Sequence, residues 1–178
     1  GEYNGVTTGQ SLQDDRTPEQ LTAEAVEAAK SADYVVFVGG MNKAHNQDCE
    51  DGDRLHYELP YAQDQLISAL AAVNDKVIFV SISGNAHGMP WNQEVEAILQ
   101  AWYSGSETGH AVADVLFGDV NPSGKLPYTI QPTLADYPAH QYGEEAYPGV
   151  DKQVYYKEDI FVGYRYADLY GTRKPIKY

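Results

Sequence analysis

The sequence is poor in several residue types, and each shortage argues against a class of protein. It has one cysteine, Cys49, so no disulfide can form within the chain. It has 12 Lys and Arg against 26 Asp and Glu, a formal net charge of −14. That sign repels phosphate backbones and anionic lipids, so we expect no nucleic-acid partner and no membrane partner. No apolar run approaches the roughly 20 residues of a membrane-spanning helix.

What remains is typical of a globular protein. The chain has 178 residues, of which 43% are hydrophobic and 21% charged. A chain of this length can bury about 70% of its unfolded surface, which is enough for a core without disulfides. We expect a polar arm or linker over residues 1–16 and a single domain over residues 17–178. The acidic composition favours a secreted or periplasmic protein over a cytoplasmic one.

Helical and apolar-strand patterns alternate along the first two thirds of the chain. Thr17 before Pro18, with Gln20 three residues after Thr17, is the pattern of a capped helix start. The expected strands are 35–38, 77–82 and 97–102, and further helices are expected at 59–70 and 108–117. The alternation predicts a mostly parallel sheet covered by helices on both faces, a three-layer αβα sandwich.

The last third has a different character. Residues 126–130 are a candidate strand, and residues 131–153, rich in Pro, Tyr and Gly, predict a long surface loop. Residues 161–166 are expected to form a last strand or a packed extended segment.

Ligands of open parallel sheets bind outside the carboxyl ends of the strands. Three loops leave those ends here, over 40–58, 84–94 and 103–107. The first is unusual, because four carboxylates fall within six residues: Asp48, Glu50, Asp51 and Asp53. Carboxylates this close raise one another's pKa, and a general acid needs a carboxyl group that keeps its proton. From the pattern alone, two interpretations remain: a loop that carries a general acid, and an acidic loop that is simply solvated.

A metal site is the third interpretation of the same loop. Its spacing does not fit a calcium-binding EF-hand, which needs alternating ligands and a glycine at the sixth position. His45 has no second His or Cys at the spacing of a zinc site. We therefore expect no metal and no cofactor.

Four motifs, in order along the chain, resemble the second domain of glycoside hydrolase family 3, which contains β-glucosidases and β-xylosidases. The resemblance covers roughly residues 18–178. It is carried by Asp53-Arg54 with Leu59-Pro60 and Gln63 or Gln65; by Ser83-Gly84-Asn85 with Met89-Pro90-Trp91; by the stretch from Ala101 to Thr129; and by Tyr156-Lys157-Glu158 with the segment from Phe161 to Tyr166. One departure is Ala86-His87-Gly88, where the family often has a proline.

The resemblance implies cleavage of β-linked glycosides with retention of configuration by two carboxylates. The nucleophile would be an Asp on a preceding barrel domain, which needs about 250 residues. Glu50, four residues before Arg54, matches the acid/base, with Asp48 and Glu158 as the alternatives.

The remaining candidate residues are expected to support the loop or to contact substrate. Asp53 and Arg54 are expected to fix the loop through charge-assisted hydrogen bonds. Asp48 is expected either to support the loop or to contact substrate. His87, on the loop after the second strand, is a candidate for substrate contact.

We thus expect a domain of a retaining, exo-acting β-glycosidase that hydrolyses terminal β-linked sugars. Its partners would be an oligosaccharide or β-glycoside substrate and the N-terminal barrel domain of the parent chain. The alternative is a non-catalytic carbohydrate-binding or scaffolding domain of the same fold. Glucosides and xylosides are not distinguished by these motifs.

Overall fold

The computed structural model describes residues 15–43 and 46–170, which form two compact units. The first comprises the described residues up to Asn85 together with Met89–Val120, and the second comprises Ala86–Gly88 and the described residues from Asn121 onward. Within the described residues, no helix has both the length and the apolar character needed to cross a bilayer. The expected arm lies almost wholly outside them, so the arm and the single domain over 17–178 stay predictions.

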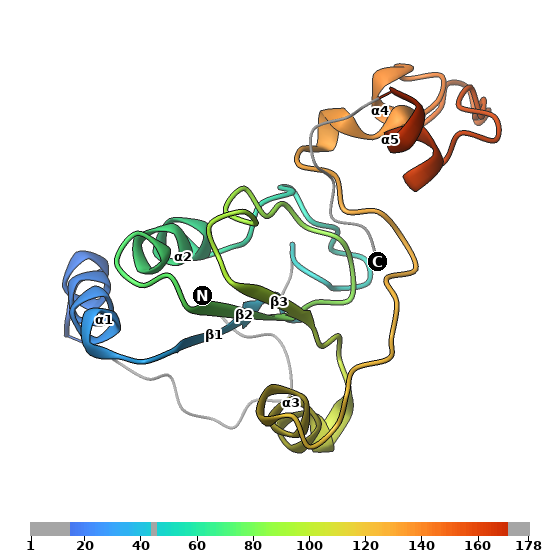
Figure 1. Cartoon of the computed structure of the whole chain (residues 1–178). Helices are drawn as coiled ribbons and strands as arrows, with labels where there is room; N and C mark the ends of the chain where they lie inside the picture. The colour runs from blue at the N-terminus through green and yellow to red at the C-terminus, as the bar shows by residue number, and fades with distance from the viewer. Residues whose placement is uncertain (1–14, 44–45, 171–178) are drawn as a thin grey trace. The chain divides into compact units, whose positions relative to one another are not determined.

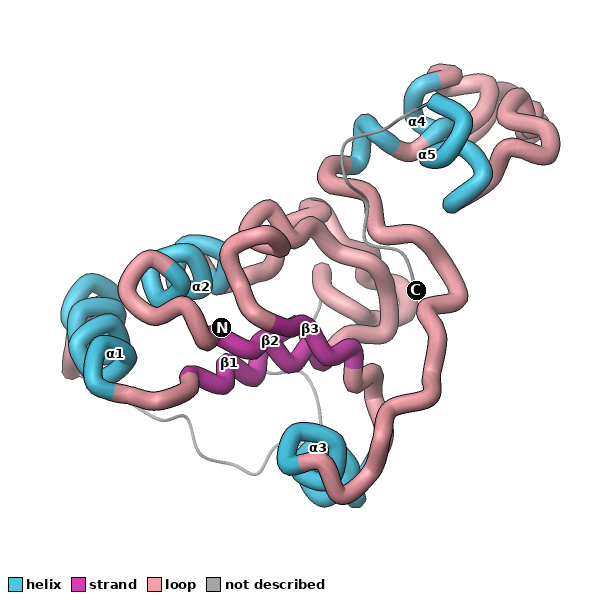
Figure 2. Tube along the Cα trace, in the orientation of Figure 1, coloured by secondary structure: helices cyan, strands magenta, loops and turns pink. Residues whose placement is uncertain are grey.

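The first unit is built on a three-stranded parallel sheet (Figure 1; Figure 2). Its strands are β1 (Val35–Gly40), β2 (Val77–Ile82) and β3 (Ala97–Gln100), in the order β1-β2-β3. The three predicted strands are confirmed. The third ends two residues early, because Trp102 has a φ of 57°, outside the extended region.

Helices lie on both sides of this sheet, which confirms the three-layer architecture (Figure 1). On one side, α1 (Pro18–Ser31) and α2 (Gln63–Ala71) pack together over a core of Ala29, Leu70 and Val77. On the other side lies α3 (Thr108–Phe117), which follows the one-turn helix η1 (Gly105–Glu107).

The second face of the sheet is less covered than the apolar pattern predicts. The run at 35–38 predicts a strand buried on both faces, but Val36 is 47% and Val38 62% exposed. Within the described residues β1 pairs only with β2, and α3 buries none of its side chains. The apolar run therefore marks a strand correctly, but not its burial on both faces.

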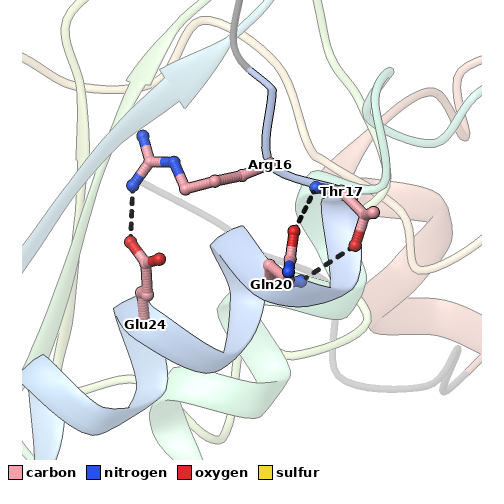
Figure 3. A network of polar contacts seen from close by, with 4 residues as sticks. All are labelled: Arg16, Thr17, Gln20 and Glu24. Carbon is pink, nitrogen blue, oxygen red and sulfur yellow. Dashed lines mark hydrogen bonds and ion pairs between the residues drawn. The ribbon is translucent and has the colours of Figure 1, made fainter.

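The helix ends follow local chemistry. In α1, the Thr17 side chain accepts from the backbone N–H of Gln20, while the Gln20 side chain accepts from that of Thr17, and Arg16 pairs with Glu24 (Figure 3). The predicted capping box is thus confirmed.

Helix α3 matches its prediction, and Gly118 ends it with a φ of 84°. Helix α2 begins at Gln63 rather than 59, because Tyr61 and Ala62 take left-handed φ values of 61° and 56°.

The second unit consists of turns and short helices. They are η2 (Leu134–Asp136), α4 (Pro138–Gln141) and α5 (Tyr164–Tyr170). The predicted strand at 126–130 is wrong, since this segment forms no strand. Residues 126–129 line a cavity of about 790 Å³. The predicted extended segment at 161–166 is also wrong, because α5 begins there and buries Tyr166 and Ala167. The predicted loop at 131–153 holds η2 and α4.

Candidate active site

The acidic loop begins at the carboxyl end of β1, where Gly40 is held tightly. Its N–H donates to Oε1 of Gln63 over 2.8 Å, and Nε2 of Gln63 donates back to the Gly40 carbonyl over 2.8 Å. Gly40 has a φ of 133°, and a Cβ there would stand 2.0 Å from the carbonyl oxygen of Ile82. Only glycine fits at this position, so the backbone at the start of the loop is fixed in one conformation.

The other end of the loop is held by Asp64, in the first turn of α2. Its Oδ2 accepts from the N–H of Leu59 over 3.1 Å, and its Oδ1 accepts from Nε1 of Trp91 over 2.7 Å. Trp91 is fully buried, with its ring edge-on to Phe79 at 4.7 Å between centroids. The loop is thereby anchored at both ends to the core of the first unit.

Glu50 lies at the tip of this loop, and its side chain is exposed. The turn around it is closed by a bridge between Cys49 and Gly52, with the N–H of Gly52 donating to the carbonyl of Cys49 over 3.3 Å. The N–H of Asn46 also donates to the carbonyl of Gly52 over 2.9 Å. The backbone at Glu50 is thus ordered by its neighbours while its carboxyl group faces solvent.

Asp48 is differently placed, because its carboxylate faces the other strand ends. Oδ2 of Asp48 accepts from the N–H of Gly84, which follows β2, over 2.7 Å, and from the hydroxyl of Tyr103, which follows β3, over 2.8 Å. The three segments that follow β1, β2 and β3 thus meet at this one oxygen. The Asp48 carboxylate is therefore bound to the ends of β2 and β3 within its own unit.

The other predicted residues have varied surroundings. Arg54 is half-buried and donates to Sδ of Met41 over 3.3 Å, which joins the two ends of the loop, whereas Asp53 is exposed. His87 is fully buried, with Nδ1 2.9 Å from the carbonyl oxygen of Gly88. Glu158 is half-buried at the cavity of the second unit. The roles predicted for these four residues stay predictions.

Among residues 15–43 and 46–170, no cluster of His, Cys, Asp and Glu has the geometry of a metal site. His45 lies outside the described residues.

Sequence reasoning missed the contribution of Tyr103. Tyr103 lies within the family motif from Ala101 to Thr129, but no spacing rule connects it with Asp48, 55 positions away. The sequence did point to Gln63, because the first motif contains a glutamine that can be either Gln63 or Gln65. The structure shows that Gln63 is the residue that holds Gly40.

Comparison with known proteins places this geometry in a family. The model of the glycosyl hydrolase family 3 C-terminal domain matches residues 3–164. The chain belongs to this family. The beta-glucosidase BoGH3A of Bacteroides ovatus is 55% identical to it over 152 residues, which are 85% of this chain and 20% of that protein.

Solved structures of β-glucosidases agree in fold. The β-glucosidase of Kluyveromyces marxianus, solved in complex with glucose, matches with a TM-score of 0.76 and 34% identity, over 89% of this chain and 18% of that one. DesR, a β-glucosidase of Streptomyces venezuelae in complex with D-glucose, matches with a TM-score of 0.75 and 37% identity, over 87% and 19%. This family 3 domain therefore spans about a fifth of the length of the relatives it matches.

Proposed function

We propose that this chain is the C-terminal domain of a retaining β-glucosidase and supplies its acid/base, Glu50. Family membership supports the class of reaction, and the relatives with similar sequence and structure are named β-glucosidases. The observation that carries the choice of residue is the contrast between two carboxylates on one loop. Glu50 is exposed at the tip, whereas Asp48 is engaged by Gly84 and Tyr103.

The chemistry assigned to Glu50 has two steps. In the first, its carboxylic acid gives a proton to the glycosidic oxygen as the bond to the anomeric carbon breaks and a nucleophilic carboxylate bonds to that carbon. In the second, the Glu50 carboxylate takes a proton from water as the water oxygen bonds to the anomeric carbon and the bond to the nucleophilic carboxylate breaks, which releases the sugar. The two displacements together retain the configuration.

The nucleophile is proposed to be an Asp on the N-terminal barrel domain of the parent protein. A retaining pair of carboxyl groups stands about 5–5.5 Å apart, so the Glu50 loop would face that Asp across the substrate. An exposed carboxyl group at the tip of a loop suits this arrangement, because it can reach a neighbouring domain.

We propose β-glucosides as the substrate class, in preference to xylosides. This preference follows from the relatives, two of whose structures hold glucose. The loop itself supplies the proton and does not distinguish the sugars.

The test is Glu50→Gln in the full-length protein. Removing the acid should lower kcat/KM by about 10²- to 10⁴-fold for a glucoside with a poor leaving group, such as a disaccharide. Cleavage of a dinitrophenyl glucoside should fall much less in its first step, because this leaving group needs little protonation. Asp51→Asn is the matched control: Asp51 is the next residue, has a φ of 62° that asparagine tolerates, and should keep normal rates. Normal cleavage of both substrates by Glu50→Gln would show that Glu50 is not the acid/base.

A further inference from the structure

The carboxylate of Asp48 is the point at which three separate loops meet. The loop after β1 contributes Asp48, the loop after β2 contributes the N–H of Gly84 at 2.7 Å, and the segment after β3 contributes the hydroxyl of Tyr103 at 2.8 Å. Both donors bond the same oxygen, Oδ2. We call Asp48, Gly84 and Tyr103 the Asp48 clasp.

The surroundings of Gly84 show that the clasp is closely fitted. A Cβ at Gly84 would stand 3.1 Å from Cε2 of Tyr103 and 3.6 Å from Oδ2 of Asp48. A side chain would therefore press on the ring that carries one donor and approach the carboxylate that both donors bind. The bare backbone at Gly84 allows its N–H and the tyrosine ring to reach Asp48 together.

The clasp is two residues from Glu50 and connects with the turn that presents it. The backbone of Asp48 is itself held, since its N–H donates to the carbonyl of Asn42 over 3.0 Å. Cys49 then bridges to Gly52 on the far side of Glu50. The backbone of Glu50 thus runs between a residue fixed by the clasp and a residue fixed by the bridge, so its exposed side chain starts from a defined position.

We propose that Tyr103 and Asp48 are positioning residues for Glu50, and that the Tyr103 hydroxyl holds the acid/base turn against the ends of β2 and β3. This inference rests on the proposed function of Glu50. Charge-assisted hydrogen bonds of this geometry are among the stronger polar contacts in proteins. The rate of proton transfer depends steeply on the placement of the acid. If the turn loses one of the donors that hold it, Glu50 should protonate the substrate more slowly, while the domain stays folded.

Tyr103→Phe in the full-length protein is the sharpest variant, because it removes the hydroxyl and keeps the ring beside Gly84. Its kcat/KM for a disaccharide should fall by about 10- to 100-fold, the scale expected for misplacement of a reacting group by about 1 Å. The value for a dinitrophenyl glucoside should fall far less, as in Glu50→Gln. Amide hydrogen exchange over residues 46–54 should become faster, while the midpoint of thermal unfolding stays within a few degrees, about the effect of one lost hydrogen bond.

The matched control is Tyr34→Phe. Tyr34 stands before the amino end of β1, is 60% exposed and carries Lys76 over its ring at 5.0 Å. Its hydroxyl is outside the clasp, so both substrates and the exchange over 46–54 should be unchanged. Asp48→Asn provides a second test. It removes the charge at nearly constant shape and should lower the disaccharide rate in the same leaving-group-dependent way as Tyr103→Phe.

The outcomes separate this inference from the proposed function. If Glu50→Gln shows the leaving-group dependence but Tyr103→Phe leaves both rates and the exchange unchanged, the positioning role is wrong and the function of Glu50 stands. Equal losses on both substrates in Tyr103→Phe would mean a general structural role and would also overturn it. If Glu50→Gln cleaves both substrates normally, the proposed function and the positioning role both fall.

Discussion

The two units of this chain use their apolar residues in different ways. In the first, parallel strands carry runs of valine and isoleucine, and fully buried side chains such as Ile67, Val77 and Phe79 form a layered core. In the second, helices of three to seven residues alternate with turns, and many tyrosines stay exposed, Tyr156 at 81%. The carboxylates proposed for catalysis and its support lie in the first unit, on a loop anchored to that core.

The buried core of the first unit gives the loop over 40–58 fixed points of attachment. A loop that carries an acid at its tip can be long if both ends are bound to a core that does not shift. Gln63 holds Gly40 at one end, and Asp64 connects Leu59 with the buried Trp91 at the other.

The largest expected effect on stability tests the core of the first unit. Phe79→Ala removes a ring that is 0% exposed and packs against Trp91, and it should lower the free energy of unfolding by about 3–5 kcal/mol. Phe117→Ala is the matched control, because this ring is 85% exposed and should change stability by less than about 0.5 kcal/mol. Urea unfolding of the chain measures both. Similar effects for the two rings would break the contrast between core and surface.

A medium effect is expected where the loop meets the core. Asp64→Ala leaves the indole N–H of the buried Trp91 without its acceptor and should cost about 1–3 kcal/mol of stability. Asp75→Ala, whose carboxylate is exposed before β2, is the control and should be nearly neutral. Hydrogen exchange should also show that Asp64→Ala frees the loop at Leu59. Unchanged exchange there would contradict the anchoring role.

The smallest effect concerns the second unit and depends on pH. Burial, with the charges of Tyr142 and Tyr170 in addition, raises the pKa of Tyr166. The neutral form is then favoured in the folded state, so its contribution to stability is complete below the ordinary tyrosine pKa of about 10 and is lost as pH rises through the raised value. Tyr166→Phe should remove this part of the alkaline destabilisation. Unfolding curves of both proteins at stepped alkaline pH measure it, and parallel losses would show that Tyr166 contributes nothing.

The parts of the fold that followed from the sequence are those with local signals. The capping box of Thr17, the three apolar strands and the Gly118 stop each depend on residues close together in the chain. The start of α2 was misplaced because the left-handed Tyr61 and Ala62 leave no mark in composition. The helix at 164–170 was missed because a short segment rich in tyrosine fits a strand pattern as well as a helix.

The site divides in the same way. The loop at the end of β1 and the candidate Glu50 followed from charge spacing and the family resemblance. The bonds from Gly84 and Tyr103 to Asp48 join residues 36 and 55 positions apart, and no pattern in one sequence reports such pairings. Without them Asp48 could not be told apart from Glu50 by its surroundings.

The central claim is that Glu50 is the acid/base, and chemical rescue of Glu50→Ala in the full-length protein tests it most directly. Removal of the carboxyl group creates space beside the anomeric carbon, and azide needs no base to attack the glycosyl-enzyme intermediate. With a dinitrophenyl glucoside, azide should raise the turnover of this variant, leave that of the wild type unchanged, and give β-glucosyl azide as the product. A turnover that azide does not change, with glucose as the only sugar product, would contradict the account.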